Sequence, residues 1–475
     1  MEKQKELSKN NQKQTESFKN QNELLLNYKD KSEFIYEVYQ VKSKVIGLIK
    51  NDKFIDSLKG SGYVVLDKTC FYSESGGQIS DTGMLIGDDF KARVIDVFKA
   101  PNGQHIHKVK LLDGKITEND ECELVLDRDR RKHIEQNHSS VHLLHYALRT
   151  LLEGDVHQAG SYVDDNKLRL DFTYSRKLTD EKVLEVEKMV NDLIKKDIIV
   201  STEIMPLDKA KELGAMALFS EKYGSVVRVV KMGKSIELCG GTHTTNTGNI
   251  KKFAISSYEN KGTSVYRIEA CTGPKITDTL YEIIKPYNDE SVKLLMKAKG
   301  IIETAKKEGI KLDFDINIEG TMVDSYEDII YYQNRLSYIQ TEVRDLEKKF
   351  FTEREKKTLN NLTTYRDNVK VYKSINGLIM EVDNMDVNLL KTIADTLVNE
   401  MKPGCVFFIN KKEDGSVNFI CRSNCHVNAG LVVKDASISS LGNGGGSPTF
   451  AQGGGKNTLM LDEIKEHLEK VFDNE

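Results

Sequence analysis

The pattern of apolar and polar positions changes several times along the chain, and each change predicts a different kind of structure. Residues 1–31 are rich in Lys, Gln, Asn and Glu and have few apolar positions, which predicts a solvated polar helix. From residue 32 to residue 127, short β-branched runs are broken by Gly and Asp. Short strands with regular turn signals predict a small β-barrel or a strongly twisted sheet.

Residues 128–273 mix helical and strand periodicities. A helix is predicted to begin near Arg130 and to continue through HSSVHLLHYALRTLLEG, and a second helix is predicted over residues 180–197. Alternating or continuous apolar runs, such as KLRLDFTY and VVRVVKMG, predict strands between and after these helices. The segment is therefore predicted to be an α+β domain.

Residues 274–362 are helical in pattern and highly charged. Apolar positions follow a 3-4 spacing over residues 329–350, which predicts a coiled-coil seam. We expect an earlier helix, around residues 278–307, to be its antiparallel partner in a helical coiled-coil hairpin, and Pro286 to kink or restart that helix. The seam consists of Ile329, Tyr332, Leu336, Ile339, Val343, Leu346 and Phe350.

Residues 363–475 predict a second, C-terminal α/β domain. Four apolar runs predict strands, and a Gly-rich loop over residues 441–455 precedes an amphipathic helix over residues 459–472. The whole chain is thus expected to be an α+β multidomain protein.

The composition is that of an ordinary globular protein. Hydrophobic residues make up 39% and charged residues 30% of the 475 residues, and no apolar run approaches the roughly 20 residues that span a bilayer. The N-terminus lacks the apolar core of a signal peptide, so we expect a cytoplasmic protein with no membrane partner. The net charge is −4, so RNA binding requires local patches such as residues 128–132.

Two short motifs carry candidate metal chemistry. His138 and His142 lie four residues apart, so on a helix both imidazoles share one face. Far downstream, the sequence Cys239-Gly-Gly-Thr-His243 offers a thiolate and a third imidazole, joined by glycines that relax the backbone. Three His and one Cys form a plausible tetrahedral Zn²⁺ set. The seven cysteines are odd in number and scattered, which argues for reduced thiols rather than a disulfide framework.

The first motif, His-Ser-Ser-Val-His, lacks the Glu of H-E-x-x-H metallopeptidases. Hydrolysis at this site would need a metal-activated water, or a hydroxyl of the substrate, to move the proton. A second metal site at Cys421, Cys425 and His426 is the less favoured interpretation, because no further ligands lie nearby in the sequence.

Taken together, these motifs resemble the editing domain of alanyl-tRNA synthetase and its free-standing AlaX relatives. The resemblance includes residues 71–83, LRLDF at 168–172, residues 214–230 and GGGSPTFAQGGGK at 444–456. It implies deacylation of tRNA(Ala) that carries serine or glycine. An apolar pocket alone discriminates an added hydroxyl by only about a hundredfold, so a second, hydrolytic site is chemically reasonable.

The resemblance also assigns candidate site residues. Gln158 matches a glutamine that the family places beside the scissile ester. Thr242 is a second candidate for contacting the substrate because it stands next to His243, and a purely structural role is the alternative for both residues. Val141 stands where the family often has Thr, so amino-acid selectivity is open. Candidates for binding substrate or tRNA are Arg169 and Asp171 in LRLDF, the turn Gly76, Gly77 and Gln78, and the C-terminal Gly444, Gly445, Gly446, Gly453, Gly454 and Lys456.

Two of these assignments have plainer alternatives. The turn at residues 76–78 is equally interpretable as an ordinary β-turn, and the Gly-rich loop as a flexible connector. In the family, that loop belongs to a DHHA1-like domain that helps to bind tRNA and to form dimers.

Three functions remain open from the sequence. The first is a free-standing editing hydrolase with Zn²⁺ as cofactor and tRNA(Ala) as partner. The second is the editing and tRNA-binding portion of a full alanine--tRNA ligase, of which the start MEKQKELSK resembles an internal segment. The third is a non-enzymatic tRNA-binding module with a structural zinc, since four protein ligands are typical of closed structural sites.

Overall fold

The computed structural model describes residues 23–152, 156–217, 223–316, 322–360 and 362–473. The chain divides into two compact units, Met1–Ser291 with Ile318–Tyr338, and Val292–Asn317 with Ile339–Glu475. Most of the predicted polar N-terminal helix lies outside the described residues, and the described part contains one short helix, α2 (Glu23–Asn27). The finer division into five domains stays a prediction.

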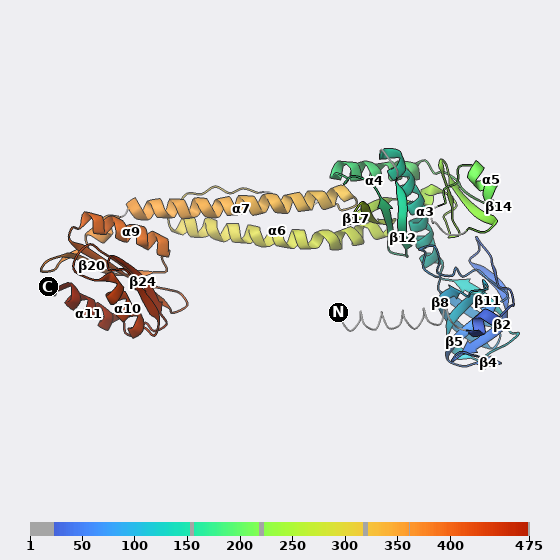
Figure 1. Cartoon of the computed structure of the whole chain (residues 1–475), viewed down its shortest axis with the longest axis horizontal. Helices are drawn as coiled ribbons and strands as arrows, with labels where there is room; N and C mark the ends of the chain where they lie inside the picture. Colours follow the sequence, from blue (N-terminus) through green and yellow to red (C-terminus); the bar gives the residue numbers. More distant parts are fainter. Residues whose placement is uncertain (1–22, 153–155, 218–222, 317–321, 361, 474–475) are drawn as a thin grey trace. The chain divides into compact units, whose positions relative to one another are not determined.

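A closed β-barrel lies in the first unit (Figure 1). Its strands are hydrogen-bonded in the order β11-β7-β8-β9-β5-β2, and β11 also pairs with β2, which closes the sheet. Residues along β8 alternate between the apolar interior and solvent, as a barrel wall requires. The barrel prediction is therefore confirmed over the open twisted sheet. The bounds are β2 (Gln40–Lys50), β5 (Ser61–Leu66), β7 (Gly83–Gly87), β8 (Phe90–Lys99), β9 (His105–Gly114) and β11 (Glu121–Leu126). Short strands are β1 (Glu33–Phe34), β3 (Lys53–Phe54), β4 (Ser57–Leu58), β6 (Lys68–Thr69) and β10 (Ile116–Thr117).

An α+β layer follows the barrel, as predicted. The antiparallel sheet β12-β13-β18-β17 packs its apolar face against α3 and α4 in one core. Asp127 and Thr179 cap these helices by accepting hydrogen bonds from Arg130 N and Lys182 N. A smaller sheet, β14-β15-β16, leads to the second metal motif. The bounds are α3 (Arg128–Leu151), β12 (His157–Val163), β13 (Leu168–Thr173), α4 (Asp180–Lys195), β14 (Val200–Pro206), α5 (Leu207–Glu212), β15 (Val226–Met232), β16 (Ser235–Leu238), β17 (Phe253–Gly262) and β18 (Val265–Thr272).

The start of α3 is tied to a loop of the barrel. Arg131 is buried, and its guanidinium binds the Asp81 carboxylate and donates to the Cys70 carbonyl at 2.8 Å. Arg130 donates to the Ser80 carbonyl at 2.7 Å. The prediction of a basic patch at residues 128–132 is thus partly wrong. Arg131 is not available to RNA, because it forms a buried ion pair that fixes the barrel loop against α3.

Two long helices, α6 (Lys275–Lys307) and α7 (Tyr326–Asn360), match the helical prediction, but their orientation corrects it. In the first unit, Gln333 donates to Tyr287 Oη at 3.2 Å. In the second unit, Lys297 pairs with Glu347, and Arg354 pairs with Glu308. The residue numbers of the paired positions rise along α6 and along α7 in the same direction. The two helices therefore run parallel rather than as an antiparallel hairpin (Figure 1).

The connection between the helices is long enough to permit this orientation. A stretch of 18 residues from 308 to 325 separates them. Fully extended, it reaches about 60 Å, whereas a helix the length of α6 spans about 50 Å. The chain therefore has enough length to return to the start of α6 before α7 begins. Pro286 is exposed, and α6 continues through it, so the predicted restart of the helix is wrong.

The C-terminal α/β fold is as predicted. The sheet order is β19-β20-β21-β22-β24-β23, with β20 and β21 parallel across the α9 crossover. One core packs α9 on one face, and another packs α10 and α11 against the remaining apolar residues of the sheet. The bounds are α8 (Leu362–Arg366), β19 (Lys370–Val371), β20 (Asn376–Asp383), α9 (Val387–Glu400), β21 (Gly404–Lys411), β22 (Val417–Ser423), α10 (Ala429–Ser439), β23 (Asn443–Gly446), β24 (Phe450–Gly455) and α11 (Leu461–Asp473).

The predicted Gly-rich loop is mostly two strands of this sheet, β23 and β24. Gly444 pairs with Gly453 across the hairpin, and both lie against α10. A Cβ on Gly453 would stand 2.2 Å from Ser437 Oγ, and a Cβ on Gly444 would stand 2.4 Å from the same atom. The glycines therefore permit close packing of helix on sheet, so the interpretation as a flexible connector is wrong.

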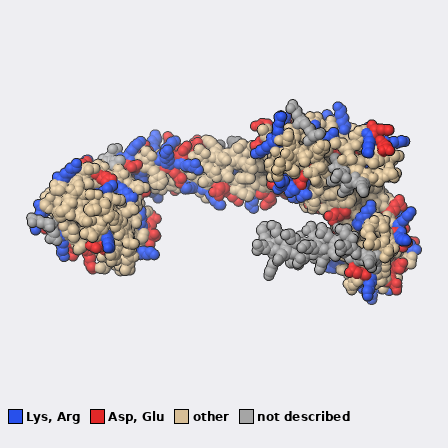
Figure 2. Space-filling model, in the orientation of Figure 1, with Lys and Arg blue, Asp and Glu red and all other residues tan. Residues whose placement is uncertain are grey.

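Charged side chains of both signs are interspersed along α6 and α7 in the view of Figure 2. Among the described residues, no helix combines the length and the apolarity that a bilayer crossing demands.

Candidate metal centre

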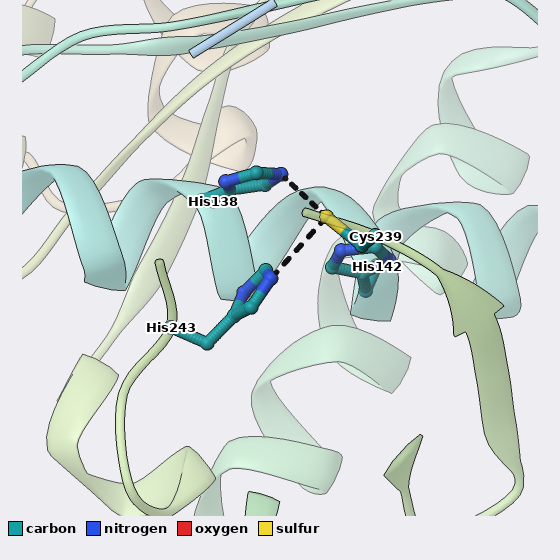
Figure 3. A group of neighbouring side chains, drawn as sticks. All are labelled: His138, His142, Cys239 and His243. Atoms are coloured by element: carbon teal, nitrogen blue, oxygen red, sulfur yellow. Dashed lines mark hydrogen bonds between the residues drawn. The ribbon is translucent and has the colours of Figure 1, made fainter. Parts of the chain in front are cut away.

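Four side chains from two distant segments meet in the first unit (Figure 3). His138 and His142 project from successive turns of α3, and the loop after β16 brings Cys239 and His243 to the same point. Their ligand atoms all lie within 4.8 Å of one another. Cys239 Sγ is 3.4 Å from Nε2 of both His138 and His243.

Hydrogen bonds orient the imidazoles of His138 and His142. Gln78 Oε1 lies 2.7 Å from Nδ1 of His138, and a Glu237 carboxylate oxygen accepts from Nδ1 of His142. With Nδ1 engaged in this way, Nε2 of each ring faces the common centre. Nε2 of His142 is buried without a hydrogen-bond partner. An orphaned imidazole nitrogen beside two others and a thiol fits the tetrahedral N₃S donor set that Zn²⁺ accepts.

The electrostatics of the donor set do not all favour metal binding. Burial opposes protonation of His142, but the charges of Glu237 and Cys239 raise its pKa to about 10, so a metal ion would have to displace a proton from this ring. Burial alone would raise the pKa of Cys239, but the neighbouring imidazoles of His138, His243 and His142 hold it well below the usual range. Burial lowers the pKa of His243 to about 3, so that ring is neutral and its unprotonated nitrogen can coordinate. Burial opposes ionisation of Glu237 too, yet His142 keeps the pKa of that carboxyl low.

Gln78 connects the barrel loop to both metal motifs. It follows Gly76 and Gly77, which have φ of +60° and +85°. Its side chain is fully buried, accepts from Thr242 N at 2.9 Å and donates to Thr242 Oγ1 at 2.9 Å. A Cβ on Gly77 would stand 2.5 Å from the Ser161 carbonyl oxygen, so the paired glycines bring the turn close to β12.

A cavity of about 330 Å³ opens beside the four side chains. Gln158 lines it, with Nε2 donating to Ser161 Oγ at 3.2 Å and Oε1 buried without a hydrogen-bond partner. Val141 contributes an apolar wall. The lining also includes Tyr72, Ser75, Gly76, His138, His142, Tyr223, Gly224, Val226, Val227, Arg228, Leu238, Cys239, Gly240 and Gly241.

Other predicted site residues lie elsewhere. Thr242 faces Gln78 and does not belong to the cavity lining. Asp171 forms a two-point ion pair with Arg267, at 2.7 and 2.8 Å, and Arg169 lies beside it. These side chains are on the solvent face of the four-stranded sheet, outside the cavity lining. The C-terminal glycines and Lys456 belong to the other unit.

Sequence reasoning missed three residues of this centre. Glu237 is buried and accepts from both His142 and His145, whose Nδ1 lies 2.8 Å away. Arg228 and Tyr36 contact the backbone of the Cys239–His243 loop. The sequence did contain a signal for Glu237, because it is the one acidic residue in the short strand Ser235–Leu238 that leads to Cys239.

A further cysteine lies near the less favoured second metal site at Cys421, Cys425 and His426. Cys405 Sγ lies 3.7 Å from Cys421 Sγ. Within the described part of the chain, however, the His138, His142, Cys239 and His243 group is the one cluster close enough to hold an ion.

Three segments of the chain match known protein families. Residues 1–130 match the class II (A) tRNA synthetases, and residues 227–269 match the second additional domain of threonyl and alanyl tRNA synthetases. Residues 374–474 match the DHHA1 domain. The second of these matches contains Cys239 and His243. Two segments of the chain are thus similar to domains of tRNA synthetases, and a third is similar to the DHHA1 domain.

More particularly, the chain is related to alanine--tRNA ligases. It is 36% identical over 485 residues to the alanine--tRNA ligase of Bacillus mycoides (strain KBAB4), a match that covers 99% of this chain and 51% of that protein. The enzyme of Acholeplasma laidlawii (strain PG-8A) is also 36% identical, over 98% of this chain and 51% of its own length. The chain spans about half the length of these curated relatives.

A solved structure of the C-Ala domain from Aquifex aeolicus alanyl-tRNA synthetase matches 22% of this chain and 98% of its own, at 24% identity. The TM-score of this match is 0.21.

Proposed function

We propose that this chain hydrolyses the ester bond of tRNA(Ala) mischarged with serine or glycine, at a Zn²⁺ site held by His138, His142, Cys239 and His243. The observation that carries the proposal is the juxtaposition of that donor set with a cavity into which Gln158 offers an unpaired acceptor. The names of the relatives and of the matched domain support the choice of tRNA(Ala) as partner.

The chain's own groups have distinct tasks in this proposal. Ser161 fixes the Gln158 amide so that Oε1 can accept a hydrogen bond from a water or from a hydroxyl or ammonium of the substrate. Glu237 and Gln78 hold two imidazoles in one tautomer and one orientation. Bound zinc would polarise the ester carbonyl or lower the pKa of a water, in addition to holding the pocket in shape.

The chain could act alone or as part of a longer alanine--tRNA ligase. The alignment with the Bacillus mycoides enzyme extends over 99% of this chain and 51% of that protein. An ATP–pyrophosphate exchange assay tests whether this chain has ligase chemistry of its own, and exchange above background would show that it does.

The decisive test compares deacylation of Ser-tRNA(Ala), Gly-tRNA(Ala) and Ala-tRNA(Ala). We expect faster hydrolysis of the mischarged forms and at least a roughly 10-fold loss of rate in Gln158→Ala and Cys239→Ala, as for other groups at metal sites. Gln340→Ala changes an exposed glutamine of α7 and should keep the wild-type rate. Equal, uncatalysed decay of all three substrates would instead favour a tRNA-binding module with structural zinc.

A further inference from the structure

An arginine on the neighbouring strand forms hydrogen bonds to the loop that carries Cys239 and His243. Arg228, on β15, donates from Nη1 to the Cys239 carbonyl at 3.0 Å and to the Gly241 carbonyl at 2.9 Å. Its own carbonyl accepts from Cys239 N at 3.1 Å. Arg228 therefore binds both ends of the Cys-Gly-Gly segment.

A tyrosine near the start of the barrel, Tyr36, forms a third hydrogen bond to the same loop. Tyr36 Oη donates to the Gly240 carbonyl at 2.9 Å. The Arg228 guanidinium carbon lies 4.3 Å from the centre of the Tyr36 ring, within the range of a cation–π contact. Burial raises the pKa of Tyr36, which keeps the phenol protonated and able to donate. Three successive carbonyls, those of Cys239, Gly240 and Gly241, are thus each held from outside the loop.

The loop requires such support because of its own sequence. Glycines carry the largest backbone entropy loss on ordering, and here two of them separate a thiol from an imidazole. Gly241 cannot be replaced to stiffen the loop, since a Cβ there would stand 2.0 Å from Cε1 of His138. Rigidity must therefore come from contacts to the carbonyls.

We propose that Arg228 and Tyr36 are positioning residues that hold the loop of residues 239–243 with its thiol and imidazole directed at the metal centre. This rests on the metal site of the proposed function but not on ester hydrolysis. Neither residue is a ligand; both act on the carbonyls that precede His243.

The test uses the full chain, stripped of metal and titrated with Zn²⁺ against a chromophoric chelator. Arg228→Lys keeps a charge but loses the planar two-point contact, and we expect Zn²⁺ affinity to fall about 10–100-fold. Tyr36→Phe keeps the ring and loses one hydrogen bond, which should cost about 5-fold. Arg93→Lys and Tyr281→Phe change exposed residues of the same unit and should leave the affinity unchanged.

Two readouts do not depend on metal. In the metal-free variants, amide hydrogen exchange should accelerate over residues 239–243 while the barrel and α3 retain wild-type protection. Alkylation of Cys239, followed by peptide mass spectrometry, should accelerate as well. A general loss of structure would instead raise exchange throughout the first unit.

The outcomes separate this inference from the proposed function. Affinity, exchange and alkylation all within twofold of wild type would overturn the positioning role. If the wild type binds Zn²⁺ but hydrolyses no ester, deacylation fails while the positioning role is judged by affinity. If the wild type binds no Zn²⁺, the proposed metal site fails, and exchange and alkylation decide the role of Arg228 and Tyr36.

Discussion

Gln78 lies in a different environment from the one that its sequence motif predicted. The Gly-Gly-Gln turn was a candidate for contacting substrate or tRNA, whereas its glutamine is fully buried between His138 and Thr242. Burial and three hydrogen bonds to the metal motifs favour an orienting role. That role was invisible in the sequence, because nothing there brings residue 78 to within hydrogen-bond reach of residues 138 and 242.

Replacement of Gln78 by leucine tests this role. Gln78→Leu would leave Thr242 N and His138 Nδ1 buried without partners, which should lower the free energy of unfolding by about 1–3 kcal/mol. Zn²⁺ affinity should fall about 10–100-fold. Urea denaturation and chelator competition measure the two effects. Wild-type values for both would show that Gln78 does not orient the centre.

A buried glutamate makes stability depend on pH. Burial raises the pKa of Glu187 to about 7, although backbone N–H groups of Ile255 and Tyr326 and the charge of Lys252 oppose the shift, and Asp328 adds to it. A carboxyl whose pKa rises on folding stabilises the protein fully below its unfolded value of about 4.5. That contribution is lost as the pH rises through about 7.

Glu187→Gln isolates this effect, because glutamine does not titrate. The unfolding free energy of the wild type, minus that of the variant, should decrease between pH 5 and pH 8. Urea denaturation at several pH values measures the difference. A difference that is constant with pH, or that grows, would contradict the burial-driven shift.

At the scale of elements, most helices and strands could be predicted from local periodicity. The prediction of α4 over residues 180–197 agrees with the observed Asp180–Lys195, because its apolar face and Thr179 cap are local signals. Two errors were not local. The orientation of α6 and α7 is defined by contacts between residues far apart in the sequence, such as Lys297 with Glu347, and the Gly-rich segment forms strands that pack closely against α10.

The orientation of the helices has a chemical test. A carbodiimide joins a lysine directly to a carboxylate, and Lys297 pairs with Glu347 in this structure. We expect that cross-link in digests analysed by mass spectrometry. An antiparallel hairpin would place the end of α6 beside the start of α7, so abundant links from Lys306 to Glu327 would contradict the parallel arrangement.

The glycine hairpin predicts opposite outcomes for two similar substitutions. Gly453→Ala drives a methyl group into Ser437 Oγ, which should destabilise the second unit by about 1–3 kcal/mol. Gly300→Ala, in α6 of the same unit, meets nothing within 4 Å and should be neutral or stabilising by up to about 1 kcal/mol. Thermal unfolding of both variants tests the contrast, and equal effects would count against close packing as the reason for glycine.

At the scale of the whole molecule, the two compact units should respond differently to metal. All four candidate ligands lie in the first unit. A Zn²⁺ concentration 100 times the dissociation constant should stabilise that unit by about 2.7 kcal/mol. Calorimetry with and without a chelator should therefore shift one transition and leave the other in place. Two shifts of equal size, or none, would contradict a site confined to the first unit.

The separation of His138 from Cys239 also bears on how the protein is made. These two residues are 101 positions apart. At about 5–20 residues per second, α3 leaves the ribosome roughly 5–20 s before the thiol does. During that interval the nascent chain can already join Gln78 to His138, while the remaining ligands do not yet exist. Capture of an ion by all four side chains would therefore have to wait until residue 243 has emerged, when the barrel has already had time to fold.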